Sequence, residues 1–342
     1  MPISRKIMGV VRLSAGPGAL SGTTTIATGA SPRRICISAD GTSVYATNAS
    51  SNTVSIFTRN TTTGALSGTS TIATKIGPFG ICISANGASV YATNYSSNTV
   101  SIFTRNTTTG ALSGTSTIAT GTGPYDACIS ADGASVYTAN SASNTVSIFT
   151  RNTTTGALSG TSTIATGSVP LGICISADGT SVYAANLSSS NVSIFTRNTT
   201  TGALSGTSTI ATGSVPRAVC ISADGASVYT ANSASNTVSI FTRNTTTGAL
   251  SGTSTIATGT APYSVAISAD GASVYTANYN SHTVSIFTRN TTTGALSGTS
   301  TIATGTQPYG VCISADGTSV YATNSSQTVG STGNRVSIFT RS

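Results

Sequence analysis

The chain has 342 residues and a formal net charge of +8, yet only 6% of its residues are charged, against about 25% in typical globular proteins. It contains no Trp, no Glu and a single His, which disfavours paired-carboxylate and histidine-based catalysis. A hydrophobic content of 38% excludes a disordered chain, and no apolar run approaches the roughly 18 residues that a membrane-spanning helix needs.

Regularly spaced prolines reveal an internal repeat. Seven of them lie 46 residues apart: Pro32, Pro78, Pro124, Pro170, Pro216, Pro262 and Pro308. The sequence around each proline is nearly identical from copy to copy. Seven units of this length predict a solenoid or a closed ring of supersecondary units.

Each copy contains four segments with the composition of β-strands and none with helical periodicity. In the second copy these segments are 81–84 (ICIS), 89–92 (SVYA), 99–105 (TVSIFTR) and 115–120 (TSTIAT). They are rich in β-branched and aromatic residues, and the Asp-Gly of the S-A-D-G connection suits a tight hairpin turn. Four antiparallel strands per copy predict an all-β fold, a seven-bladed β-propeller.

The two ends of the chain complement each other. The last copy stops at Ser342, directly after its third strand, while residues 18–28 (GALSGTTTIAT) read as a fourth strand before the first proline. We expect this N-terminal strand to complete the C-terminal blade and close the ring of residues 14–342. Residues 1–13 then form an extension, either a frayed terminus or a strand that assembles the protein into an oligomer or fibre.

The repeat resembles the YVTN-type propeller repeat and the related lactonase-like seven-bladed propellers. The resemblance covers the chain from about residue 14 and rests on S-A-D-G-x-S-V-Y, S-N-T-V-S-I-F, T-G-A-L-S and a Tyr-x-x-Asn in every copy, such as Tyr45 and Asn48. It implies the propeller fold more than an activity, because propellers carry many functions. The sugar-lactone hydrolases among these relatives use acidic, His and Arg side chains at the channel mouth.

Three polar residue types recur once per copy. Cysteines occupy one slot in six copies (Cys36, Cys82, Cys128, Cys174, Cys220 and Cys312), with Ala266 in the seventh. Because this spacing is not that of a zinc site, we expect buried, unpaired thiols and no metal. Asp residues, replaced once by Asn86, are expected to form turns. Seven Arg residues, the first being Arg59, are expected to pack their stems between blades with their heads in solvent.

Differences between the copies gather in two connections. One leads into the first strand of each copy, and the other joins the second and third strands. In a four-stranded meander these two connections share one face of the disc, which we call the variable face. It carries every aromatic residue outside the repeat pattern: Phe79, Tyr95, Tyr125, Tyr263, Tyr279 and Tyr309. Drift after duplication explains the location, but a bias toward Tyr, Phe and Arg favours a binding surface.

The candidate ligand-binding residues therefore come from the variable face. They are Arg33, Arg34, Lys75, Phe79, Tyr125, Asp126, Leu171, Arg217, Tyr263, His282, Tyr309 and Arg335. The residues that directly follow the prolines are expected to surround the mouth of the central channel. Aromatic planes there can stack on sugars and guanidinium groups can pair with anions. No catalytic residue is assigned.

The sequence leaves two functions open. Its composition favours a non-enzymatic binding or structural propeller that recognises a protein or a glycan, without a cofactor. The alternative, implied by the resemblance, is a lactonase-like hydrolase of sugar lactones. Thinly spread positive charge does not favour nucleic acid as a partner. The start of the sequence lacks the pattern of a secretory signal, and free thiols favour the cytoplasm, with an extracellular or virion-surface assembly as the alternative.

Overall fold

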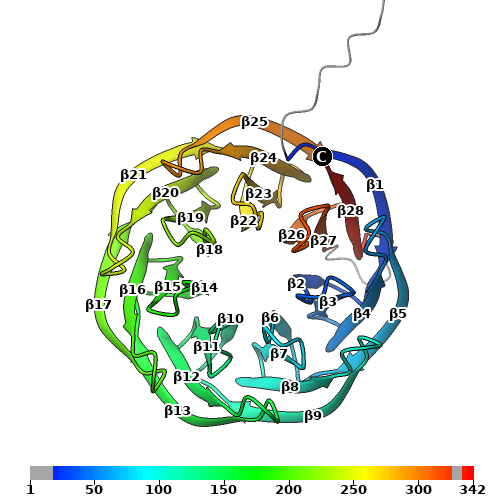
Figure 1. Cartoon of the computed structure of the whole chain (residues 1–342), viewed down its shortest axis with the longest axis horizontal. Helices are drawn as coiled ribbons and strands as arrows, with labels where there is room; N and C mark the ends of the chain where they lie inside the picture. Colours follow the sequence, from blue (N-terminus) through cyan, green and yellow to red (C-terminus); the bar gives the residue numbers. More distant parts are fainter. Residues whose placement is uncertain (1–17, 326–332) are drawn as a thin grey trace, which may run out of the picture.

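The computed structural model of the protein describes residues 18–325 and 333–342. Within these ranges, 28 strands form seven four-stranded antiparallel sheets. The sheets are arranged as blades around a central axis, as Figure 1 shows. The prediction of an all-β, seven-bladed propeller is confirmed. Among the described residues no helix is long and apolar enough to span a membrane.

The strands follow the repeat closely, and each blade begins at its proline. Blade 1 has β2 (Pro32–Ile37), β3 (Ser43–Asn48), β4 (Thr53–Arg59) and β5 (Leu66–Ala73); blade 2 has β6 (Pro78–Ile83), β7 (Ser89–Asn94), β8 (Thr99–Arg105) and β9 (Leu112–Ala119). Blade 3 has β10 (Pro124–Ile129), β11 (Ser135–Asn140), β12 (Thr145–Arg151) and β13 (Leu158–Ala165); blade 4 has β14 (Pro170–Ile175), β15 (Ser181–Asn186), β16 (Asn191–Arg197) and β17 (Leu204–Ala211). Blade 5 has β18 (Pro216–Ile221), β19 (Ser227–Asn232), β20 (Thr237–Arg243) and β21 (Leu250–Ala257); blade 6 has β22 (Pro262–Ile267), β23 (Ser273–Asn278), β24 (Thr283–Arg289) and β25 (Leu296–Ala303). Blade 7 has β26 (Pro308–Ile313), β27 (Ser319–Asn324), β28 (Arg335–Arg341) and β1 (Leu20–Ala27).

The ring is closed by both ends of the chain. β1 pairs antiparallel with β28, with Leu20 opposite Arg341 and Ala27 opposite Arg335. Two backbone bonds extend the ladder: the Gly18 N–H donates to the Ser342 carbonyl at 2.7 Å, and the Ser342 N–H donates to Ala19 at 3.0 Å. The expected N-terminal strand is therefore present in the C-terminal blade. The extension at residues 1–13 lies outside the described residues.

Burial differs strongly between the strands of a blade. All six residues of each second strand, such as β3, are buried, whereas the outermost strand, such as β5, exposes most of its Ser and Thr side chains. The core lies between neighbouring blades rather than within one. Ile35, Val44 and Phe57 of blade 1, for example, pack with Tyr321 and Val336 of blade 7. A blade therefore cannot bury its apolar surface alone, and the ring folds as one unit.

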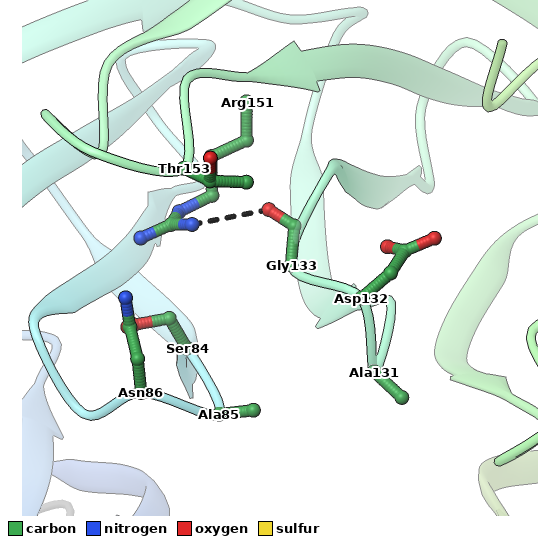
Figure 2. Close-up of a pocket in the computed structure, with 8 residues that line it drawn as sticks. All are labelled: Ser84, Ala85, Asn86, Ala131, Asp132, Gly133, Arg151 and Thr153. Atoms are coloured by element: carbon green, nitrogen blue, oxygen red, sulfur yellow. Dashed lines mark hydrogen bonds between the residues drawn. The ribbon is translucent and has the colours of Figure 1, made fainter. Parts of the chain in front are cut away.

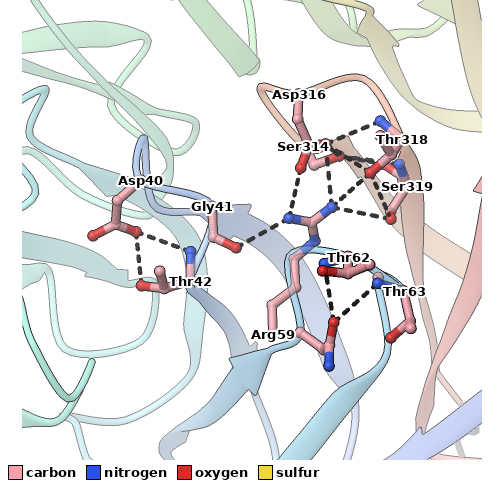
Figure 3. A network of polar contacts seen from close by, with 12 residues as sticks. Asp40, Gly41, Thr42, Arg59, Thr62, Thr63, Ser314, Asp316, Thr318 and Ser319 are labelled. Atoms are coloured by element: carbon pink, nitrogen blue, oxygen red, sulfur yellow. Dashed lines mark hydrogen bonds and ion pairs between the residues drawn. The ribbon is translucent and has the colours of Figure 1, made fainter.

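A buried arginine joins each blade to the preceding one. Figure 3 shows the example of Arg59 in blade 1, whose guanidinium pairs with Asp316 of blade 7 at 2.8 Å. Its Nε donates to the Tyr321 hydroxyl at 2.7 Å, and its Nη1 donates to the Gly41 carbonyl at 3.2 Å. Tyr321 in turn donates to the Gly64 carbonyl of blade 1 at 2.7 Å. These bonds tie the two blades together in both directions.

The same network recurs around the ring, with one exception. Five further Arg–Asp pairs link neighbouring blades at 2.8–3.0 Å: Arg105–Asp40, Arg197–Asp132, Arg243–Asp178, Arg289–Asp224 and Arg341–Asp270. At the remaining interface, which contains Arg151 of blade 3, the position of the Asp is taken by Asn86 of blade 2. We refer to these seven arginines, with their Asp or Asn partners, as the arginine ring.

Two expectations from the sequence are corrected here, the solvated arginine heads and the tight hairpin turn, and a third, the turn role of the Asp residues, is extended. The arginine heads do not reach solvent: the Arg59 side chain is fully buried, while its partner Asp316 is 39% exposed. The Asp residues do more than form turns, because each bonds its own turn and also neutralises the arginine of the next blade. Asp40, for example, accepts from the Thr42 N–H at 2.9 Å and from Arg105 at 2.9 Å. The connection spans residues 38–42 and is longer than a two-residue hairpin turn.

Removing the closing strand should destabilise the whole ring. Deletion of residues 1–28 exposes the edge of β28 and takes away the Gly18 carbonyl that accepts from the Tyr275 hydroxyl. We expect a lower thermal midpoint, or oligomers formed by strand exchange, measured by calorimetry and size-exclusion chromatography with light scattering. A variant lacking only residues 1–13 keeps β1 and serves as the control. A monomeric 29–342 chain that melts like the parent would contradict the role of β1.

The arginine ring should make the protein sensitive to acid. Burial alone would raise the pKa of Asp40 and Asp178, but bonds from serine, threonine and arginine lower each pKa to about 2. Because the folded pKa lies below the unfolded one, the stabilisation is present above about pH 4 and is lost as the pH falls toward 2. Urea unfolding across this range should show a falling free energy of unfolding. The slope should be smaller in Asp40→Asn, and an unchanged slope in that variant would refute the linkage.

Candidate functional site at the channel mouth

Seven residues that directly follow the prolines begin the innermost strands of the ring, which Figure 1 shows around the central axis. We call them the mouth residues: Arg33, Phe79, Tyr125, Leu171, Arg217, Tyr263 and Tyr309. The loops behind them are tied together by backbone bonds. The Ala49 N–H, for example, donates to the Ser31 carbonyl at 2.9 Å. The two variable connections therefore share one face, as predicted.

The aromatic mouth residues contact one another both between neighbouring blades and across the channel. The ring of Phe79 lies 4.8 Å from that of Tyr125, and the ring of Tyr309 lies 5.2 Å from that of Tyr263, between centroids. The hydroxyls of Tyr125 and Tyr309, from blades 3 and 7, are in hydrogen-bond contact. Tyr125, Tyr309 and Leu171 are all buried in this cluster. The side chains expected to surround the mouth therefore pack into one cluster, which we call the aromatic plug: Phe79, Tyr125, Leu171, Tyr263 and Tyr309.

Two arginines lie against this plug. The Arg33 guanidinium is 4.6 Å from the centre of the Tyr309 ring and 5.1 Å from that of Phe79. The Arg217 guanidinium is 4.0 Å from the centre of the Tyr263 ring. Such cation–π contacts hold the planar groups at a fixed orientation. Arg33 also has a buried Nε without a hydrogen-bond partner among the described residues.

The residues two positions after each proline form a second layer of side chains in the channel, below the mouth residues. These side chains have little room. A Cβ on Gly80 would lie 2.6 Å from the Cα of Asp126, so only glycine fits there. Where the layer holds larger residues they reach across the channel. Arg34 of blade 1 donates to Ser264 Oγ of blade 6 at 3.0 Å and lies 3.6 Å from the Asp126 carboxylate of blade 3. The two charges are mostly buried, with 10% and 18% of their side chains exposed.

The environment of Asp126 distinguishes it from the six aspartates of the arginine ring. Burial raises the pKa of its carboxyl above the usual value, and the positive charge of Arg34 and backbone N–H groups only partly oppose this effect. Burial likewise raises the pKa of the Tyr125 hydroxyl, reinforced by Tyr309. A buried carboxylate with a raised pKa binds a proton more readily than an ordinary aspartate, which suits acid–base chemistry.

The backbone leading into the mouth is strained. Every residue directly before the seven prolines has a positive φ, and only two of the seven are glycines. Val169 and Val215 have φ values of 58° and 60°, which β-branched residues rarely adopt. Strain of this kind persists only where the surrounding structure enforces it, and it concentrates at functional sites.

Three of the candidate residues lie apart from the mouth. Lys75 is exposed in the loop before β6. His282 is exposed, and its Nδ1 accepts from the Gln307 N–H at 3.0 Å. Arg335 begins β28 and donates to Thr25 Oγ1 at 3.1 Å. The structure thus gathers Arg33, Arg34, Phe79, Tyr125, Asp126, Leu171, Arg217, Tyr263 and Tyr309, and leaves these three at the periphery.

Two serines that the sequence analysis did not select belong to the same site. Ser264 accepts from Arg34, and Ser233 Oγ accepts from Arg217 Nε at 3.1 Å. Ser264 occupies the second position after its proline, where the copies differ, so the variation between copies was a usable signal. Ser233 looks like any other loop serine, and only the folded structure identifies it.

No metal site is assigned to this region. The described part of the chain holds no group of three or more His, Cys, Asp or Glu side chains that could bind a metal ion. All six cysteines are free, as expected, and are half-buried rather than fully buried. Desolvation raises the pKa of their thiols, in Cys220 and Cys312 to about 12. The thiols are therefore neutral at physiological pH and are poor nucleophiles.

Comparison of the sequence with protein families gives a clear match. The profile of the family described as "Lactonase, 7-bladed beta-propeller" matches residues 7–78, 67–173, 128–220, 161–257 and 216–315. A search of curated proteins found no match.

Two of the similar solved structures are of proteins described as lactonases. A Bacteroides fragilis protein provisionally assigned as a 6-phosphogluconolactonase has a TM-score of 0.73 at 24% identity, covering 82% of this chain and 86% of its own. The periplasmic gluconolactonase of Pseudomonas aeruginosa has a TM-score of 0.72 at 19% identity, covering 81% and 86%.

A third similar structure has a different function. Hydrazine synthase of Kuenenia stuttgartiensis has a TM-score of 0.69 at 22% identity, covering 88% of this chain and 95% of that one. At such identities the three likenesses show the fold alone. The family profile, in contrast, matches far more than half of the sequence. The chain therefore belongs to the lactonase family of seven-bladed β-propellers.

Proposed function

We propose that this protein binds a sugar-derived lactone at the channel mouth and hydrolyses it. The observation that carries the proposal is the Arg34–Asp126 pair, a mostly buried carboxylate and guanidinium 3.6 Å apart directly next to the aromatic plug. Membership of the lactonase family supports the same reaction class. Lactone hydrolysis therefore replaces non-enzymatic binding, which the composition alone favours, as the leading hypothesis.

The mouth residues and the neighbouring Tyr279 supply groups of the kind that a sugar lactone requires. Tyr263 stacks on Tyr279 with ring centres 4.3 Å apart at an angle of 11°, and aromatic planes suit the carbon face of a sugar. Arg33 and Arg217, held against aromatic rings, supply donors for hydroxyl or phosphate groups. The ligand would thereby be oriented with its carbonyl toward the charged pair.

The reaction needs one base and one oxyanion-stabilising group. Asp126, in its deprotonated form, takes a proton from a water molecule as the water oxygen bonds to the lactone carbonyl carbon. Arg34 stabilises the negative charge that develops on the carbonyl oxygen. The ester C–O bond then breaks, and the ring oxygen receives the proton from Asp126. The product is the open hydroxy acid, and the carboxylate is regenerated.

A binding function without turnover is the second candidate. The observation that favours it is the packing of Tyr125, Leu171 and Tyr309, which are 4–8% exposed and fill the mouth with side chains rather than with open space. A sugar could then rest on the outer rings of the plug without reaching Asp126. The two candidates share one surface and differ in whether the bound lactone is opened.

Lactone opening by the purified protein tests the proposal directly. We expect 6-phosphogluconolactone or gluconolactone to be consumed faster than in the spontaneous reaction, measured by proton release in weak buffer. Asp126→Asn should lower kcat/KM by about 100-fold or more, the usual contribution of a general base. Asp224→Asn, the same change in the arginine ring, is the matched control and should keep its activity.

The pH profile gives an independent readout. Since the base acts when deprotonated and burial raises its pKa, kcat/KM should rise with pH along a limb centred above the ordinary aspartate value of about 4. This limb should vanish in Asp126→Asn. Binding of either lactone without turnover by the parent protein would instead establish the binding function, and full activity in Asp126→Asn would reject its role as the base.

A further inference from the structure

The arginine ring has one incomplete member on the face opposite the channel mouth. Arg151 of blade 3 is buried like the other ring arginines, but the position of its partner aspartate is taken by Asn86 of blade 2. Among the described residues no carboxylate lies within 4 Å of the Arg151 guanidinium, whereas the other six ring arginines each have one. One buried positive charge is left without a counterion.

Arg151 does not use all of its N–H donors in bonds to the protein. Its Nε donates to the Tyr91 hydroxyl at 2.5 Å, its Nη1 to the Gly133 carbonyl at 3.1 Å and its Nη2 to Ser89 Oγ at 3.0 Å. A guanidinium has five N–H donors, so these bonds do not exhaust it. In the complete interface next to it, Arg105 Nη2 also binds Asp40 at 2.9 Å.

The orientation of Asn86 adds a second donor to the same place. Its Oδ1 accepts from Ser84 Oγ at 2.7 Å and from the Ala88 N–H at 3.2 Å, as Oδ1 of Asp132 does in its own turn. The amide nitrogen therefore stands where the other ring aspartates place the oxygen that pairs with arginine. In Figure 2 this nitrogen points toward the Arg151 guanidinium, and the Asp132 carboxylate points away from both.

A cavity lies between the Arg151 guanidinium and the Asn86 amide. It measures about 180 Å³ and is lined by Ser84, Ala85, Asn86, Ala131, Asp132, Gly133, Arg151 and Thr153. Asp132, the one acidic residue in the lining, is already paired with Arg197 at 3.0 Å. The cavity therefore combines a buried guanidinium, an amide donor and room for a small molecule.

We propose that this cavity is a binding site for a small carboxylate anion. The bound carboxylate would take the place that an aspartate side chain occupies at the other six interfaces, accepting from Arg151 and from the Asn86 amide. Charge-assisted bonds to a guanidinium are strong and favour a planar two-oxygen acceptor. The site is independent of the proposed lactone chemistry, because the residues that form it belong to the opposite face of the disc.

Acetate is the probe for the test, with sodium chloride at equal ionic strength as the reference. We expect calorimetric titration of the parent protein to detect one saturable acetate site, and acetate to raise the melting temperature. Asn86→Asp supplies the missing carboxylate from within the chain, as in six natural blades, so it should fold and should weaken acetate binding by at least about tenfold. Its melting temperature should exceed that of the parent without acetate.

A second variant opens an equivalent gap elsewhere. Asp224→Asn removes the partner of Arg289 in a turn where Ala226 corresponds to Ala88, and it should bind two acetate ions per chain. Equal acetate binding by the parent and Asn86→Asp would overturn the proposal, as would an effect of acetate no larger than that of chloride. Binding of phosphate but not of acetate would also reject a carboxylate site.

Discussion

The structure depends on burying one guanidinium group at every blade interface. A buried arginine is costly unless each of its donors finds an acceptor and its charge finds a counterion. Every ring arginine binds a tyrosine hydroxyl from the preceding blade and a turn carbonyl from its own, and six of the seven also pair with an aspartate from the preceding blade. Since Tyr45 also donates back to the Gly110 carbonyl at 2.7 Å, the tyrosine is held from both sides. A Cβ on Gly110 would lie 2.2 Å from Ser43 Oγ, so this loop cannot accept a side chain there.

This requirement explains why one face of the disc barely varies between copies. The turn with the aspartate and the loop with the glycine carbonyl are both part of the arginine ring, so most changes there would leave a buried donor unsatisfied. The opposite face has a repeated network of its own, in which the Asn that ends each second strand donates to a Ser of the third strand, as Asn48 Nδ2 does to Ser55 Oγ at 2.9 Å. Its two connections are also joined through the backbone, as the Tyr95 N–H is to the Gly77 carbonyl at 2.8 Å. The residues directly after the prolines take no part in these repeated bonds, so they differ between copies and form a single asymmetric site.

The sequence predicts the fold well and the site only in part. Strands, blades and the closing β1 follow from local composition and from a repeat that is visible by inspection. The burial of Arg59 does not, because its partner Asp316 is 257 residues away and nothing local distinguishes a solvated arginine from a buried one. The positions of the mouth residues were predictable from the variation between copies. The collapse of Tyr125 and Tyr309 into a plug was not, because it depends on side chains from blades that meet only across the channel.

Because the interfaces between blades are nearly identical, they do not by themselves fix the number and the order of the blades. Each blade offers the same tyrosine to the next blade and receives the same arginine from it, so these contacts alone barely distinguish one order of blades from another. The contacts of Arg34 do depend on the number and order of the blades. This side chain reaches Asp126 of blade 3, the Arg217 carbonyl of blade 5 at 3.5 Å and Ser264 of blade 6 simultaneously. Adding or losing a blade would change the span across the axis, and exchanging blades would move the partner side chains, so either change would separate these groups. The side chains that form the site therefore also constrain the diameter of the ring and the order of its blades.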